Sequence, residues 1–228
     1  MRKMSFKVLA TLPLIALVSF LFSGVAYATL VTSLPNGTLQ TMPAVNYAGG
    51  GPYKFGNNII WASSLSNGIF GWIGSYGFTG NGTWTGAPAF AGLNGIDNTM
   101  TFTFGNGPVQ GVGGLFNYDP NLNTGNYFTF SALGSSGNVI ESHQISFVSG
   151  GTNTGETYYI EQPTADIYAI ELSGGIVAIR NLQTETSSTA PTTGLTSSAV
   201  PAPPVFVLLL GALALLMARK KAVPMKNR

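Results

Sequence analysis

The sequence contains no cysteine, one histidine and few charged residues, which make up 8% of its 228 positions. Without cysteine the chain can form no disulfide bond and can hold neither a thiolate metal site nor a cysteine nucleophile. The single histidine, His143, excludes a zinc site built from several imidazole ligands. The sequence therefore predicts no cofactor and no metal.

Basic residues are scarce between the two ends of the chain. Three of the ten Lys and Arg residues fall within 1–28 and five within 200–228, which leaves only Lys54 and Arg180 between them. All eight acidic residues lie in that middle section, so its formal charge is 2 − 8 = −6. Two cations cannot neutralise the many phosphates of a nucleic acid, and we therefore expect no nucleic-acid partner.

The first 28 residues have the three parts of a secretory signal peptide. Residues 2–7 carry three basic side chains, residues 8–25 are uncharged and mostly apolar, and Ala26 and Ala28 are small residues at the cleavage positions. The pattern predicts that signal peptidase cuts after Ala28. The exported chain is then expected to begin at Thr29.

The last segment, residues 200–228, combines a proline box, a short apolar run and a basic cluster. Prolines cannot continue a helix, so the box holds the chain extended just before the run at 205–218. A helix over that run would be about 21 Å long, which is shorter than the ~30 Å hydrocarbon core of a bilayer. The box and the cluster are defined by Val200, Pro201, Pro203, Arg219, Lys220 and Lys221.

This arrangement resembles the PEP-CTERM sorting signal of Gram-negative bacteria, in which a Val-Pro-x-Pro box, a Leu/Gly/Ala-rich helix and an Arg/Lys cluster follow one another. The resemblance covers about an eighth of the chain, and Ala202 stands where the commonest form carries Glu. It implies recognition by an exosortase-like protease, a transient inner-membrane stage through the single apolar helix, and delivery to the cell surface. An ordinary C-terminal membrane anchor is the alternative interpretation.

Between the two tags the sequence predicts one domain at residues 29–182 and a Thr/Ser-rich linker at 183–199. Helical periodicity is nearly absent, and short segments of alternating polarity are separated by turns rich in Gly and Asn. This spacing predicts an all-β fold, a β-sandwich of jelly-roll type. The expected strands are 58–64, 69–78, 99–104, 108–118, 126–133, 138–148, 155–160, 166–172 and 176–182.

Three short pieces of the domain are similar to the sandwich domain that often precedes a PEP-CTERM tail. They are Phe-Thr-Phe at 102–104, Val-Gly-Gly-Leu-Phe-Asn at 112–117 and Ala-Ile-Arg-Asn-Leu at 178–182. The last piece carries Arg180 where that domain commonly has Asp. The resemblance therefore does not extend to a cation held through that Asp.

Two features suggest chemistry, and both have a simpler interpretation. His143 lies on a predicted strand beside Ser142, but no nucleophile-elbow motif accompanies any serine, so we expect a non-catalytic protein. Residues 119–126 place oxygen-bearing side chains at alternate positions, as calcium loops do. However, Thr124 stands where an EF-hand needs Gly and Phe130 where it needs Glu, which favours an Asx-rich hairpin loop.

Aromatic residues gather in one segment, 53–84, which contains all three tryptophans. Aromatic side chains exposed on a sandwich face can stack on sugar rings. Trp61, Trp72 and Trp84 are therefore candidate glycan contacts, and burial in the core is the alternative.

Together these features predict an exported, non-catalytic β-sandwich protein that is sorted to the cell surface or to an extracellular polysaccharide matrix, as in a biofilm. Its expected partners are signal peptidase, an exosortase-like sorting protease, the membrane before processing, and exopolysaccharide. The alternative function is a secreted carbohydrate-binding protein or carbohydrate-active enzyme with the same sorting tag.

Overall fold

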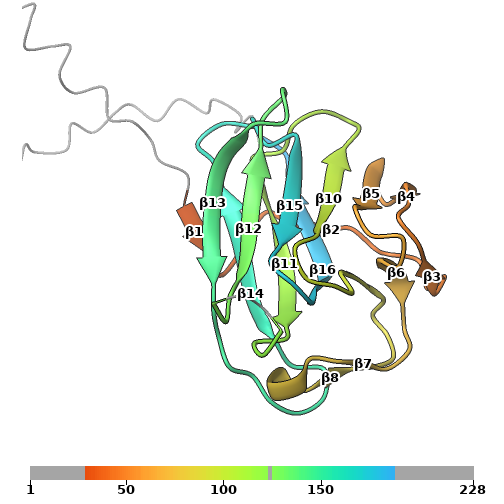
Figure 1. Cartoon of the computed structure of the whole chain (residues 1–228). Coiled ribbons are helices and arrows are strands. Elements are labelled where there is room, and N and C mark those ends of the chain that lie inside the picture. The colour runs from red at the N-terminus through yellow and green to blue at the C-terminus, as the bar shows by residue number, and fades with distance from the viewer. Residues whose placement is uncertain (1–28, 123–124, 188–228) are drawn as a thin grey trace, which may run out of the picture. The chain divides into compact units, whose positions relative to one another are not determined.

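The computed structural model describes residues 29–122 and 125–187. The predicted signal peptide, the sorting segment and most of the predicted linker lie outside these residues. The described residues form two facing sheets and one small hairpin, and their only helix is the short 3-10 turn Thr79–Asn81 (Figure 1). In this part of the chain no helix has the length and apolar character needed to cross a membrane.

Sheet A contains eight strands. Seven follow the order β1-β14-β11-β16-β9-β6-β3, and β2 pairs with the C-terminal end of β16. Sheet B contains six strands in the order β13-β12-β15-β10-β5-β4. The strands of sheet A are β1 Thr29–Val31, β2 Thr38–Leu39, β3 Tyr47–Ala48, β6 Ile69–Trp72, β9 Phe90–Gly92, β11 Gly111–Tyr118, β14 Glu156–Glu161 and β16 Val177–Glu185. Those of sheet B are β4 Tyr53–Phe55, β5 Ile59–Ser63, β10 Thr99–Phe104, β12 Phe128–Leu133, β13 Val139–Ile145 and β15 Ala169–Ser173. The prediction of an all-β, sandwich-like fold is confirmed.

The main core lies between the two sheets because alternate residues of each strand point inward. On β10, Met100, Phe102 and Phe104 are buried, while the threonines between them face outward. On β12, Phe128 and Phe130 pack inward, and both rings contact Phe116 of sheet A at centroid distances of 5.4 and 5.0 Å. Full burial of each such side chain stabilises the fold by about 1.5–3 kcal/mol.

A second, smaller core covers the outer face of sheet A. The hairpin β7 Tyr76–Gly77 and β8 Thr83–Trp84 folds back over β9 and β16, at the lower end of the view in Figure 1. The buried members of this second core are Ile69, Phe78, Trp84, Phe90 and Ala178.

This hairpin corrects the prediction of one continuous strand at 69–78. The structure divides that segment into β6 in sheet A and β7 in the hairpin. Gly71 has a φ of +61°, a value that a glycine adopts without strain, and β6 is irregular there in its pairing with β9. The chain then leaves the sheet, and Tyr76 pairs with Trp84 instead.

The domain also extends beyond its predicted end at residue 182. β16 continues to Glu185 because Gln183 and Thr184 pair with β2 and Glu185 pairs with Gly111 of β11. The side chains of Thr184 and Glu185 are buried. Residues 183–185 therefore belong to sheet A and not to the linker.

Candidate functional site

Two of the three tryptophans proposed as glycan contacts lie in the core, which corrects that part of the prediction. Trp61 is 0% exposed and packs against Phe70, with the ring centroids 5.3 Å apart. Trp84 is also 0% exposed and donates from Nε1 to the carbonyl of Thr154. Neither ring has a face available to a sugar, whereas Trp72 is partly exposed.

Arg180 is buried beneath the loop between β13 and β14. Its guanidinium carbon lies 4.4 Å from the centroid of the Trp84 ring, and Nη1 donates to Asn153 Oδ1 at 3.1 Å. Within the described residues no carboxylate forms an ion pair with it, and burial lowers the pKa of the guanidinium. The arginine therefore fixes this loop through a cation–π contact and hydrogen bonds to Asn153.

Asp119 forms an Asx turn at the start of the loop that the sequence compares with a calcium loop. Its Oδ1 accepts a hydrogen bond from the backbone N–H of Asn121 at 2.9 Å, and its Oδ2 accepts one from the Thr79 hydroxyl. Both carboxylate oxygens are thus engaged with protein donors. Across residues 29–122 and 125–187, no three His, Asp or Glu side chains cluster as a metal site would require.

His143 contacts Glu141, two residues away on β13, through its Nε2. The neighbouring serine does not face it, because adjacent residues of a strand point to opposite sides. Ser142 instead lies 2.9 Å from the hydroxyl of Ser131 on β12. The residues at this position thus form no serine–histidine pair.

The outer face of sheet B is rich in hydroxyl groups. We call it the hydroxyl face, and it is defined by Thr99, Thr101 and Thr103 of β10, Thr129 and Ser131 of β12, Ser142 of β13 and Ser173 of β15. Glu171 lies near its middle, in register with Thr101 on one side and Ser131 on the other. Burial raises the pKa of this carboxyl.

A groove of about 310 Å³ crosses one end of the hydroxyl face. Thr101 and Thr103 line one side, and Leu133 and the β12–β13 turn line the other. Tyr168 also lines it and is 38% exposed, while its backbone N–H donates to the carbonyl of Leu133 at 2.8 Å. The alternation Thr-x-Thr-x-Thr is visible in the sequence, but only the packing of β15 between β10 and β12 creates the groove.

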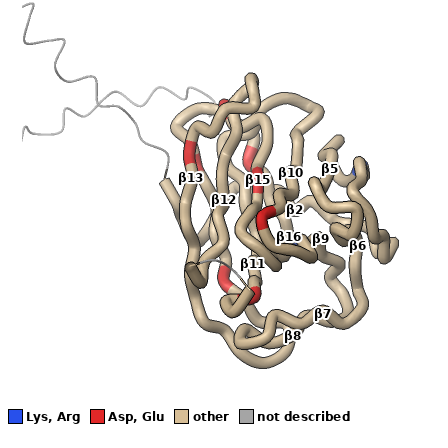
Figure 2. The backbone as a smooth tube through the Cα atoms, in the orientation of Figure 1, with Lys and Arg blue, Asp and Glu red and all other residues tan. Residues whose placement is uncertain are grey.

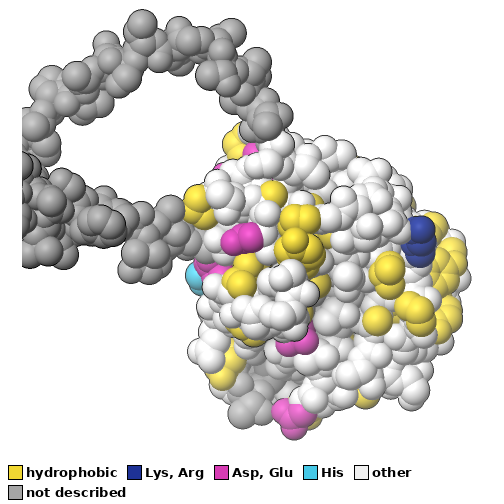
Figure 3. Space-filling model, turned by 90° about the horizontal axis from the view of Figure 1, so that it is seen from above, with side chains coloured by type: hydrophobic (Ala, Val, Ile, Leu, Met, Phe, Trp, Pro, Cys, Tyr) yellow, Lys and Arg dark blue, Asp and Glu magenta, His cyan; other side chains and the backbone are white. Residues whose placement is uncertain are grey.

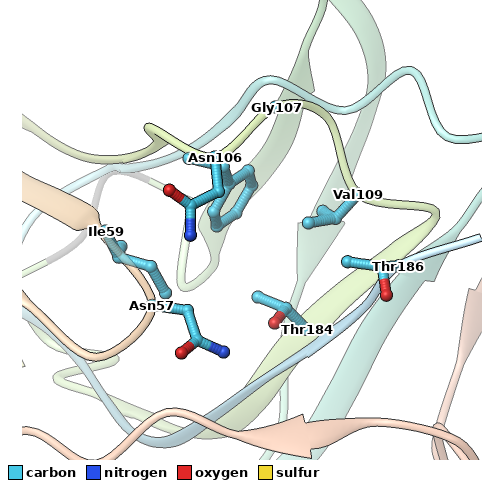
Figure 4. A pocket seen from close by; sticks show the side chains of 8 residues that line it. Asn57, Ile59, Asn106, Gly107, Val109, Thr184 and Thr186 are labelled. Atoms are coloured by element: carbon cyan, nitrogen blue, oxygen red, sulfur yellow. The ribbon is translucent and has the colours of Figure 1, made fainter.

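A second hollow, of about 100 Å³, lies where the two sheets open beside the end of β16. Figure 4 shows Asn57 and Ile59 on one side and Val109 and Thr186 on the other. Pockets for small molecules usually measure ~300 Å³ or more, so this hollow is too small for such a ligand.

Charge is sparse over the whole domain. Acidic residues are spread over several strands and loops and do not gather in one patch (Figure 2). Seen from above, most of the surface is uncharged, with apolar side chains scattered over it and little basic surface (Figure 3). The groove itself is lined by no Lys, Arg, Asp or Glu side chain.

The chain enters and leaves sheet A at the same end. Thr29 of β1 pairs with Glu161 of β14, Glu161 also pairs with Gly111 of β11, and Gly111 pairs with Glu185 of β16. These four residues form one row across adjacent strands. At ~4.8 Å between neighbouring strands, the points of entry and exit are about 14 Å apart.

Comparisons of the chain with protein-family models, curated proteins and solved structures gave no match.

Proposed function

We propose that this protein is exported, stays briefly attached to the inner membrane through its tail, and is then sorted to the cell surface or extracellular matrix as a non-catalytic sandwich domain. The main support is that Thr29 and Glu185 lie in the same row of paired residues across sheet A. Because entry and exit lie about 14 Å apart, an N-terminal and a C-terminal membrane segment can be held on the same side of the folded domain.

The lengths on either side of the domain agree with this proposal. The described residues of β1, Thr29–Val31, all follow the predicted cleavage site, so cleavage after Ala28 removes none of them. On the other side, residues 188–199 can span up to about 40 Å when fully extended. The proline box can therefore reach a membrane-embedded protease without unfolding of β16.

We also assign the sandwich to the jelly-roll type. The supporting observation is the order β9-β16-β11-β14 in one sheet and β10-β15-β12-β13 in the other, which is the pattern of two Greek keys. Many surface and binding domains have this architecture, but the architecture alone defines no ligand.

The double variant Pro201→Ala/Pro203→Ala tests the sorting proposal. It keeps the apolar length and the basic cluster that an ordinary anchor needs, so an anchor should tolerate it. On our proposal the variant accumulates in the inner membrane at precursor size, while the parent chain loses its tail and appears outside. The matched control, Pro191→Ala/Pro224→Ala, changes two prolines outside the box and should be processed like the parent. Identical fractionation of all three chains, with Arg228 retained, would refute the proposal.

The alternative function, carbohydrate binding with the same tag, is favoured by one observation, the groove on the hydroxyl face. It is compatible with sorting to a polysaccharide matrix.

A further inference from the structure

We propose that the groove on the hydroxyl face binds a segment of uncharged polysaccharide. This inference rests on the proposed function for the availability of such a polymer outside the cell, but the binding itself can be tested on purified protein.

The groove offers hydrogen-bonding groups that the protein does not use. Within the described part of the chain, the hydroxyls of Thr101, Thr103 and Tyr168 make no side-chain hydrogen bond. Threonines two apart on a strand lie ~6.8 Å from each other, and neighbouring strands are ~4.8 Å apart. The hydroxyls are therefore spread over a surface and can meet several groups of one ligand, as the alternating hydroxyls of a sugar chain require.

The groove also offers the apolar surface that sugar rings need. Leu133 lines it, and the partly exposed ring of Tyr168 carries both an apolar face and a polar end. Its volume of about 310 Å³ reaches the lower limit of small-molecule sites, ~300 Å³. A short stretch of a longer chain fits this volume and can continue over the sheet face on either side.

The charge of the groove determines which class of polysaccharide it can bind. Lys54 and Arg180 are the only cations in the described residues, and neither lines the groove. The carboxyl of Glu171 lies on the same face of the sheet, in register with Thr101, and it is an anion and not a cation when ionised. A polyuronate or a phosphate polymer would find no cation to pair with, so the chemistry of the groove fits a neutral glycan.

The experiment uses the full chain, purified in a mild detergent, on an array of neutral oligosaccharides. The array covers glucans, mannans and galactans with α and β linkages at positions 3, 4 and 6, together with an alginate hexamer as the anionic probe. The best neutral glycan is then titrated by calorimetry. We expect binding of at least one neutral glycan and none of alginate.

Three variants locate the site. Tyr168→Ala removes the ring, and Thr101→Val/Thr103→Val removes two hydroxyls with little change of shape, so each should weaken binding by about tenfold or more. Thr157→Val, on the outer side of β14 in sheet A, is the matched control and should bind like the parent. Tyr168→Phe keeps the ring and removes only the hydroxyl. Weaker binding by this variant therefore reports loss of the hydroxyl and not loss of the fold.

The proposal is overturned if no neutral glycan binds, if alginate binds as tightly, or if the groove variants bind like the control while keeping their melting temperatures. None of these outcomes affects the sorting proposal, which is tested by fractionation. Conversely, a tail that is never cleaved would leave binding by the groove unchanged.

Discussion

Replacing Gly113 by alanine is expected to force β14 away from the middle of β11. A Cβ atom at this position would lie 2.0 Å from the carbonyl oxygen of Tyr158 and 2.6 Å from the Cα of Tyr159. These are backbone atoms of the neighbouring strand, so no side-chain rotation can relieve the contact. Overpacking in a rigid core costs about 1–3 kcal/mol, and each ladder hydrogen bond weakened by the shift adds about 1 kcal/mol. We therefore expect Gly113→Ala to lower the free energy of unfolding by about 2–4 kcal/mol.

Gly77→Ala is the matched control, because its added Cβ meets no atom within 4 Å. It should change stability by less than about 1 kcal/mol. Urea unfolding followed by tryptophan fluorescence measures both variants, since Trp61 and Trp84 are fully buried. At about 2–4 °C per kcal/mol, Gly113→Ala should also lower the melting temperature by roughly 5–15 °C. Equal midpoints for the two variants would refute the close approach of β14 to β11.

Three further predictions concern export, metal and pH. Ala28→Arg should leave an uncleaved, membrane-held precursor, and an exported protein that still begins with Met1 would contradict cleavage before Thr29. Chelator should leave the melting temperature unchanged, because both oxygens of Asp119 accept protein hydrogen bonds; a fall of several degrees would reveal a bound ion, which stabilises the folded state by mass action. The raised pKa of Glu171 means that the folded state binds its proton more tightly than the unfolded chain, so stability falls as pH rises through the folded pKa. Glu171→Gln should therefore raise the melting temperature at pH 7 and not below pH 4, and an equal effect at both pH values would show that charge is not the cause.

The strands with strict alternation could be predicted closely from the sequence. The strand expected at 99–104 is β10 Thr99–Phe104, and the one expected at 126–133 is β12 Phe128–Leu133. In both, every second residue is apolar and buried, so the pattern determines the inward face.

The placement of the aromatic residues and the groove could not be predicted in the same way. Trp84 is buried only because the hairpin β7–β8 folds over sheet A, and no local pattern specifies that contact. The groove depends on long-range pairing, which brings Tyr168 beside the turn that follows Leu133. Likewise, Gln183 and Thr184 resemble linker residues in composition, but pairing with β2 makes them part of the sheet.

The intact mass of the protein recovered from the extracellular fraction tests the central claim most directly, because it reports both ends of the chain at once. The account predicts a single species that begins at Thr29 and has lost the basic cluster that starts at Arg219. A mass that includes Arg228, or recovery of the protein only with the membrane, would contradict it.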